Sequence, residues 1–336
     1  EKHVLEGFFH DTLGEADRER AVGLVRGFIL RQFDNPAPAV DLNDADKAGT
    51  TFDEAQTLVA PLPEGSLKGW WWKTYRKGLR WAGMVSDGVS LGHRTGFDSG
   101  STLDYVYRNE ARGAGFIGRM VDRNYLDAIG WRGIRQRKLH LEESIRNAMA
   151  RLRADGAPVR VLDIAAGHGR YVLDALMAES ARPESVLLRD YSDINVRDGR
   201  RLIAEKDLAG VARFEEGDAF DTESVASAQP GTTIGIVSGL YELFPSNDLI
   251  RASLAGMARA VEAGGYLIYT GQPWHPQLEM IARALTSHRE SEAWVMRRRS
   301  QAEMDQLVRE AGFEKVGQRI DEWGIFTVSI ARRKTA

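Results

Sequence analysis

The stretch Val159-Arg-Val-Leu-Asp-Ile-Ala-Ala-Gly-His-Gly-Arg-Tyr171 decides the fold of this 336-residue chain. It begins with a short β-branched and aliphatic run, which is typical of a buried parallel strand. A small-residue turn with Gly167 and Gly169 follows, and then the apolar spacing of a helix. Open α/β sheets bind nucleotide-like ligands beside such a glycine turn, at the carboxyl end of the strand that precedes it.

A carboxylate in this turn distinguishes two kinds of ligand. In the dinucleotide fingerprint a third glycine packs the helix against the strand, and Val172 occupies that position here. Asp163 would repel a pyrophosphate, because like charges about 4 Å apart cost on the order of 4 kcal/mol at an effective dielectric constant of about 20. It would attract the ammonium and sulfonium groups of S-adenosylmethionine (SAM), directly or through water. The turn therefore favours SAM over NAD.

Two further acids follow predicted strands. Asp190 ends the strand predicted over 185–190, where its carboxylate is placed to bind ribose hydroxyls. Asp218 follows the strand predicted over 211–215 and is placed to accept from an adenine amino group, with Ala219 or Phe220 beside the ring. A single acid at a strand end is more often a helix cap or a solvated turn. Three acids at consecutive strand ends favour one shared ligand site.

These motifs carry a family resemblance. From residue 139 onward the chain resembles a class I SAM-dependent methyltransferase, with Asp163-Ile-Ala-Ala-Gly-His-Gly169, Asp190 and Gly217-Asp218 in the family's order. The resemblance implies a doubly wound, Rossmann-like α/β sheet of seven strands that ends in a hairpin with one antiparallel strand. It departs at Ala165, where the family usually has a glycine. The predicted cofactor residues are Asp163, Ala165, Gly167, Gly169, Asp190, Tyr191, Asp218, Ala219 and Ser238.

A narrower resemblance includes regions outside these motifs. Tyr191, the run 238–244 and the run 271–277 resemble an uncharacterised bacterial family of predicted methyltransferases, often fused behind an α/β-hydrolase domain. Residues 1–35 resemble the tail of such a hydrolase, which makes a fused or partner hydrolase an expected partner. We expect no hydrolase activity here, since no serine and acid precede His10 and Gly88-Val-Ser90-Leu-Gly92 lacks a preceding strand.

Composition suggests the remaining organisation. Prolines and polar residues predict a linker over 36–66. We expect residues 67–138 to form a mainly helical, aromatic-rich extension or lid. The methyltransferase domain then covers 139–336. The segment 67–84 alternates Trp and Tyr with Lys and Arg, which suits a helix lying at a membrane interface. The more common alternative packs Trp70, Trp71, Tyr75 and Leu79 onto the core.

Bulk properties exclude several classes of protein. A net charge of −3 and a pI near 6.2 argue against a nucleic-acid partner. The absence of cysteine excludes disulfides and thiolate metal sites, and we predict no metal. No apolar run is long enough to span a bilayer. We therefore expect a cytoplasmic protein, with peripheral membrane association through 67–84 as the alternative.

The expected chemistry is an in-line displacement of a methyl group from SAM to a small or lipid-like acceptor. The loops after the strands predicted over 233–238 and 266–270 face the methyl group, and they supply Tyr241, Glu242 and His275. His275 is the best base by its ordinary pKa, with a hydrogen-bonded loop histidine as an equal alternative. Glu242 is a second base or the binding site for a cationic amine, and Tyr241 would bind a cation through its ring. A noncatalytic SAM-binding module that regulates a hydrolase is the rival function, and a nicotinamide oxidoreductase ranks third.

Overall fold

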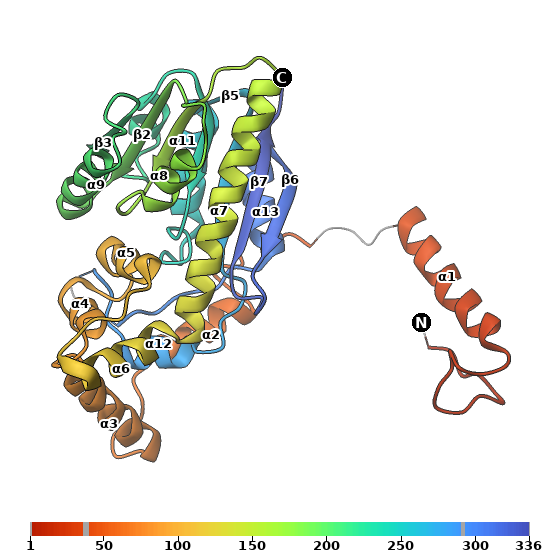
Figure 1. Ribbon diagram of the computed structural model, residues 1–336. Helices are drawn as coiled ribbons and strands as arrows, with labels where there is room; N and C mark the ends of the chain where they lie inside the picture. The colour runs from red at the N-terminus through yellow and green to blue at the C-terminus, as the bar shows by residue number, and fades with distance from the viewer. Residues whose placement is uncertain (1, 36–39, 290–292, 336) are drawn as a thin grey trace. The chain divides into compact units, whose positions relative to one another are not determined.

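The computed structural model describes residues 2–35, 40–289 and 293–335, and it divides into two compact units (Figure 1). The first unit, Glu1–Asp41, contains helix α1 (Arg18–Asp34). The second unit, Leu42–Ala336, contains the other helices and all the strands.

One sheet forms the centre of the second unit. Its strands lie in the order β3-β2-β1-β4-β5-β7-β6. The bounds are β1 (Arg160–Ile164), β2 (Ser185–Asp190), β3 (Ala212–Glu216), β4 (Thr232–Val237), β5 (Val261–Gly271), β6 (Phe313–Ile320) and β7 (Thr327–Arg333). Strands β1 to β5 are parallel, and β7 is antiparallel to both of its neighbours. The predicted seven-stranded, Rossmann-like α/β sheet with one antiparallel strand is therefore confirmed.

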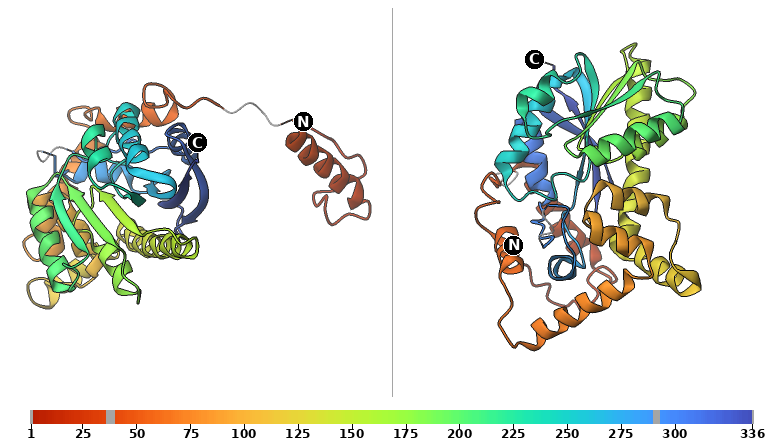
Figure 2. Two further views of the ribbon diagram at one scale, coloured as in Figure 1. Left: turned by 90° about the horizontal axis from the view of Figure 1, so that it is seen from above. Right: turned by 90° about the vertical axis from the view of Figure 1, so that its left-hand side faces the viewer.

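Helices cover both faces of the sheet (Figures 1 and 2). Neighbouring residues of β1 explain the two layers, because Val161 packs in one buried cluster and Leu162 in the other. The first cluster includes residues of α7 (Ile129–Ala154), α8 (Arg170–Met177) and α9 (Asp193–Glu205). The second includes residues of α10 (Thr222–Ser227), α11 (Asn247–Ala260) and α13 (Gln301–Glu310).

A third buried cluster lies in a helical region whose residues meet the carboxyl ends of the parallel strands. This region consists of α3 (Leu67–Ala82), α4 (Asp87–Thr95), α5 (Gly100–Arg108), α6 (Gly115–Leu126) and α12 (Leu278–Ala284), as Figure 1 shows. Helix α7 continues without a break from this region to the sheet, so the boundary predicted at residue 139 falls inside one helix. Ser90 lies within α4 and not on a strand-to-helix turn, in keeping with the expected lack of a hydrolase nucleophile.

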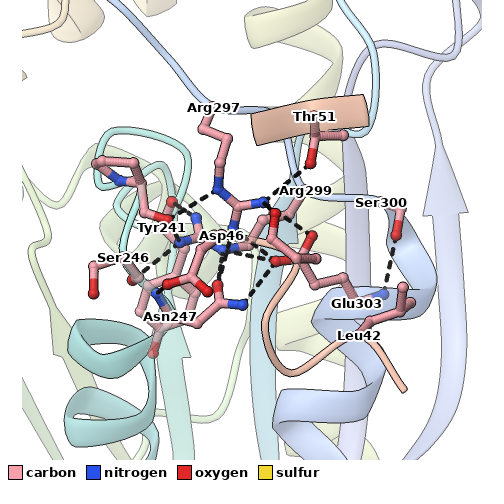
Figure 3. Close-up of polar contacts among 12 residues, drawn as sticks. Leu42, Asp46, Thr51, Tyr241, Ser246, Asn247, Arg297, Arg299, Ser300 and Glu303 are labelled. Atoms are coloured by element: carbon pink, nitrogen blue, oxygen red, sulfur yellow. Dashed lines mark hydrogen bonds and ion pairs between the residues drawn. The ribbon is translucent and has the colours of Figure 1, made fainter. Parts of the chain in front are cut away.

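The linker predicted over 36–66 is wrong for residues 42–66. These residues contain α2 (Thr50–Val59), whose last turn is held by Arg283, which donates to the carbonyl oxygens of Thr57 at 2.9 Å and Ala60 at 2.7 Å. The buried Arg297 also donates to the carbonyl oxygen of Ala45 and the hydroxyl of Thr51, both at 3.2 Å (Figure 3). Prolines and acidic residues suggested a linker, but arginines from distant segments fix this stretch. Residues 36–39 lie outside the described residues.

Candidate active site

A first cavity of about 600 Å³ lies at the carboxyl ends of β1 to β4. Eight of the nine predicted cofactor residues line it: Ala165, Gly167, Gly169, Asp190, Tyr191, Asp218, Ala219 and Ser238. They come from four separate strand ends, and the sheet order brings them together at the edge where ligands bind in doubly wound folds.

The glycine turn between β1 and α8 is held in place by Asp190. Its carboxylate accepts hydrogen bonds from the backbone N–H of Gly167 at 2.9 Å, that of Ser192 at 3.0 Å and the amide of Asn195 at 3.0 Å. Burial raises the pKa of Asp190. Gly169 has a φ of +70°, and a Cβ there would lie 2.4 Å from Leu188, so the turn requires glycine. The turn and the end of β2 therefore form one connected unit.

Ala165 adopts a left-handed conformation with a φ of +56°. Such a conformation costs a residue with a Cβ roughly 1–2 kcal/mol. We therefore expect Ala165→Gly to stabilise the protein by about 0.5–1 kcal/mol in urea unfolding, after the greater chain entropy of glycine is deducted. Ala166→Gly is the matched control, because Ala166 has no positive φ, and it should destabilise by a similar amount. If Ala165→Gly destabilised the protein, the backbone at Ala165 would not be strained.

Asp163 does not line this cavity, which disfavours direct contact with a cofactor, and the contact through water stays a prediction. The side chain is fully buried within β1, which pairs with β2 on one side and β4 on the other. Its Oδ2 accepts from the hydroxyl of Tyr171 at 2.7 Å, and burial raises its pKa well above the usual range. Asp163 thus anchors α8 beneath the turn. Its Oδ1 is buried and has no hydrogen-bond partner among the described residues.

The helical region contributes residues that sequence reasoning missed. Ser99, Gly100, Asp104 and Tyr107, from α5 and the residue before it, line the first cavity. Asp104 pairs with Arg170 at 2.5 Å and lies 3.7 Å from His168 of the glycine turn. Burial alone would raise the pKa of Asp104, but hydrogen bonds from His168 and Arg170 lower it. No motif indicated these residues, because they lie on an ordinary amphipathic helix.

A second cavity of about 410 Å³ adjoins the first. Four residues line both: Asp98, Leu103, Gly239 and Leu243. Its walls are mostly apolar and aromatic, and they include Trp131, Trp294, Met296 and Phe326. Two of the predicted catalytic residues, Glu242 and His275, line this cavity.

Polar atoms without partners gather in the second cavity. Glu242 Oε1 accepts from the Thr270 hydroxyl at 3.0 Å and lies 3.7 Å from Arg137 Nη1. Glu242 Oε2, Arg137 Nε and Trp294 Nε1 are buried and have no hydrogen-bond partner among the described residues. Buried polar atoms are nearly always paired, so these three favour a polar ligand group. Arg137 is 3% exposed, and its burial follows from the fold and not from a local sequence pattern.

Tyr241 lines neither cavity, so its predicted catalytic position is wrong. The residue is 2% exposed and packs in the second buried cluster, which includes residues of α10, α11 and α13. Its hydroxyl donates to Ser253 Oγ of α11 at 3.1 Å, and burial raises its pKa. Neighbouring residues of this loop point in opposite directions, so Tyr241 enters the core and Glu242 enters the cavity.

His275 lies in the second cavity, but its accepting ring nitrogen is already hydrogen-bonded. Its Nδ1 accepts from the backbone N–H of Gln277 at 3.0 Å. Burial lowers the pKa of His275 to about 4, so the ring is neutral at pH 7 and its hydrogen is on Nε2. The Nε2–H is a donor and the lowered pKa makes the ring a weak base, which favours the hydrogen-bonded loop histidine over the predicted base.

The lowered pKa of His275 predicts a pH dependence of stability. The unfolded side chain binds a proton below about pH 6.5 and the folded one only near pH 4, so the free energy of unfolding should fall as the pH decreases. Between pH 7 and pH 5 we expect this histidine to account for a loss of about 2 kcal/mol. In urea unfolding at both pH values, His275→Asn should remove that loss, while His10→Asn at an exposed position should keep it. Equal pH dependence in all three proteins would refute the assignment.

Comparisons with known proteins agree with this architecture. The chain is 54% identical over 337 residues to "Uncharacterized protein YnbC" of Escherichia coli (strain K12), covering 99% of this chain and 57% of that protein. The chain thus spans a little over half the length of this curated relative.

Among solved structures, one described as a possible exported protein from Bordetella parapertussis aligns with a TM-score of 0.59 and 17% identity, over 89% of this chain and all of that one. An O-methyltransferase family protein from Burkholderia thailandensis aligns with a TM-score of 0.49 and 16% identity, over 96% of each chain. A family model described as "Putative methyltransferase" matches residues 25–333. That match spans most of the sequence, and the chain therefore belongs to this methyltransferase family.

Proposed function

We propose that this protein transfers the methyl group of SAM to an acceptor bound in the second cavity. The observation that carries the proposal is the junction of the two cavities at Asp98, Leu103, Gly239 and Leu243. A donor in the first cavity and an acceptor in the second would meet there. Such alignment of two reactants lowers the activation barrier of a displacement reaction, by up to roughly 7–11 kcal/mol.

The residues around the first cavity fit SAM. The carboxylate of Asp190 lines the cavity near the glycine turn, and Asp218 follows β3 at the same edge. Ser238 Oγ, at the end of β4, is buried and has no hydrogen-bond partner among the described residues. The ribose hydroxyls of SAM would donate to the carboxylate of Asp190. Val172, in place of the third glycine of the dinucleotide fingerprint, supports SAM over a dinucleotide.

When bound, SAM supplies an electrophilic methyl group on its sulfonium. The chain's own residues hold the acceptor. Glu242 Oε2 is the carboxylate oxygen left to accept a hydrogen from a hydroxyl or an amine, because the Asp98 carboxylate is already bonded to Ser287 and His288. Arg137 Nε and Trp294 Nε1 are left to donate. The aromatic walls exclude water, so Glu242 is the group placed to take a proton.

The lining of the second cavity supports one class of acceptor. An apolar body matches the aromatic and aliphatic walls, and one polar group matches the three partnerless atoms. A small aromatic or a lipid-like amphiphile with one hydroxyl, carboxyl or amino group has this character. A polymer does not fit in a cavity of about 410 Å³.

Titration calorimetry and a transfer assay test the proposal together. We expect saturable SAM binding by the wild type, and transfer of a radiolabelled methyl group from SAM to an apolar compound within a panel of small aromatics and bacterial lipids. Glu242→Gln should keep SAM binding and lose transfer by about 100-fold or more. No heat with millimolar SAM would overturn the proposal.

The noncatalytic module remains the second candidate, because the chain spans only part of its curated relative. It predicts SAM binding and no transfer to any compound, with a change in the activity of a fused or partner hydrolase. Binding of NADH in place of SAM would favour an oxidoreductase. The second cavity beside the first favours catalysis over the noncatalytic module.

A further inference from the structure

Helix α3 exposes three of its tryptophans and the leucine at its start. Leu67, Trp70, Trp71 and Trp81 are 87%, 65%, 56% and 71% exposed, and no residue of the helix is buried. The alternative that packs this helix onto the core is therefore wrong for Trp70 and Trp71, whereas Leu79 does pack against the third buried cluster. Three exposed tryptophans on one helix form a large apolar surface patch, and exposed apolar patches of this kind mark interaction surfaces.

Basic residues lie beside these tryptophans. Helix α3 carries Lys68, Lys73, Arg76, Lys77 and Arg80 and no acidic residue, in a chain whose net charge is −3. Lys68 pairs with Glu279, and Arg76 donates to the carbonyl oxygen of Arg283, so these two face the body. Within the described part of the chain, Lys73, Lys77 and Arg80 have no ion pair and are exposed. They share the outer side of the helix with Trp70 and Trp81, by helical spacing.

The exposed apolar surface continues at the start of α6. Phe116, Ile117 and Met120 are 75%, 65% and 57% exposed. The backbone N–H of Ala114 donates to the carbonyl oxygen of Val85 at 2.9 Å, which places this start beside the end of α3. The exposed Met84 lies between them in sequence, and the right-hand view of Figure 2 shows α3 along one rim of the molecule.

The inner sides of the same two helices line the second cavity. Tyr75, Leu79 and Ala82 of α3 and Val121, Asn124 and Tyr125 of α6 form part of its wall. The two helices therefore separate the cavity proposed for the acceptor from the exposed aromatic and basic surface. An amphiphile held at that surface would be next to the cavity.

We propose that the outer faces of α3 and α6 dock on an anionic lipid bilayer and that the acceptor is a membrane amphiphile. This inference rests on the proposed function for the acceptor, but its docking part is tested separately. Tryptophan prefers the interface between headgroups and acyl chains, and lysine and arginine bind anionic headgroups. Among the described residues no helix is long and apolar enough to cross a membrane, so the docking is peripheral.

The unpaired positive charges of Lys73, Lys77 and Arg80 favour a membrane over a protein as the partner of this surface. A protein interface core is depleted of lysine, whereas three basic side chains beside three exposed indoles suit a lipid surface. Each basic side chain near an anionic surface strengthens binding by about fivefold, so three together should contribute about 100-fold.

Flotation with vesicles tests the docking. We expect the wild type to float with vesicles of phosphatidylcholine and phosphatidylglycerol and much less with phosphatidylcholine alone. Lys73→Gln, Lys77→Gln and Arg80→Gln together should weaken binding by about 100-fold, and Trp70→Ala, Trp71→Ala and Trp81→Ala together should abolish it. The matched controls change exposed residues elsewhere and should bind as wild type: Arg197→Gln, Arg201→Gln and Arg213→Gln for charge, and Leu249→Ala, Val316→Ala and Ile320→Ala for apolar area.

The outcomes separate this inference from the proposed function. Circular dichroism and SAM calorimetry on each variant should match the wild type, since the changed residues are exposed and lie outside the first cavity. Intact SAM binding without flotation overturns the docking and leaves the methyl transfer standing. Flotation without SAM binding supports the docking and overturns the transfer. A tryptophan variant that changes a dimer to a monomer in light scattering would assign the face to a second copy and overturn the bilayer.

Discussion

Asp190→Ala should weaken SAM binding by at least about 100-fold in titration calorimetry. The carboxylate is placed for the ribose hydroxyls, and charged hydrogen bonds contribute roughly 1.5–3 kcal/mol each. The same side chain holds the glycine turn through the backbone N–H of Gly167 and the amide of Asn195. The substitution thus removes ligand contacts and loosens the turn at once.

A neighbouring acid provides the control. Asp193→Ala changes an exposed carboxylate three residues further along, which bonds the backbone of Ile194 and does not line the first cavity. It should bind SAM as the wild type does. Equal affinities for the wild type and Asp190→Ala would remove Asp190 from the site, whereas losses in both variants would indicate a general disturbance of this segment.

Arg297→Met should lower the free energy of unfolding by about 3–5 kcal/mol. The guanidinium is 1% exposed and donates to Glu303 at 2.6 Å and Asn247 at 3.0 Å (Figure 3). Removing Arg297 leaves the buried carboxylate of Glu303 with a weaker ion pair to Arg299 at 3.9 Å, and this loss of charge compensation is the costly change. Urea unfolding followed by circular dichroism measures the effect.

The adjacent arginine shows whether burial is the cause. Arg298 pairs with Glu54 but is partly exposed, so Arg298→Met should cost less than about 1 kcal/mol. Similar losses for both variants would contradict the account of a buried pair. Glu303→Gln in the Arg297→Met background should recover part of the stability, because it removes the charge that the first change leaves behind.

This network also fixes the loop that carries Glu242. Arg299 donates to the carbonyl oxygens of Phe244 at 2.8 Å, Pro245 at 2.9 Å and Ser246 at 3.1 Å, and to that of Tyr241. Burial, with the neighbouring charge of Arg297, lowers the pKa of Arg299 to about 10, which keeps it charged at pH 7. The loop after β4 is thereby held from the side opposite the cavity.

The sequence predicted the strands and the first cavity well. Parallel buried strands read as short apolar runs, and the residue that ends each strand must lie at the same edge of the sheet. Asp190, Asp218 and the glycines could therefore be placed together from spacing alone. Asp163 was predicted to lie where the strand enters the glycine turn, but it lies within β1 and its side chain is buried in the core.

The second cavity was less predictable. Glu242 and Tyr241 are neighbours in one loop, and no periodic pattern says which of them enters the core. The protonation of His275 depends on a backbone N–H two residues away and on burial by distant helices. Residues 42–66 were misread for a similar reason, since their partners Arg283 and Arg297 lie more than two hundred residues away in the chain.

By itself, the sequence determined the sheet, the glycine turn and the strand-end acids, because each follows from local spacing and from the geometry of parallel strands. Only the tertiary structure decided which side chains face the second cavity, which buried charges hold its loops and which tryptophans stay exposed. These properties depend on contacts between segments far apart in the chain, where burial sets both the pKa and the exposure of a residue.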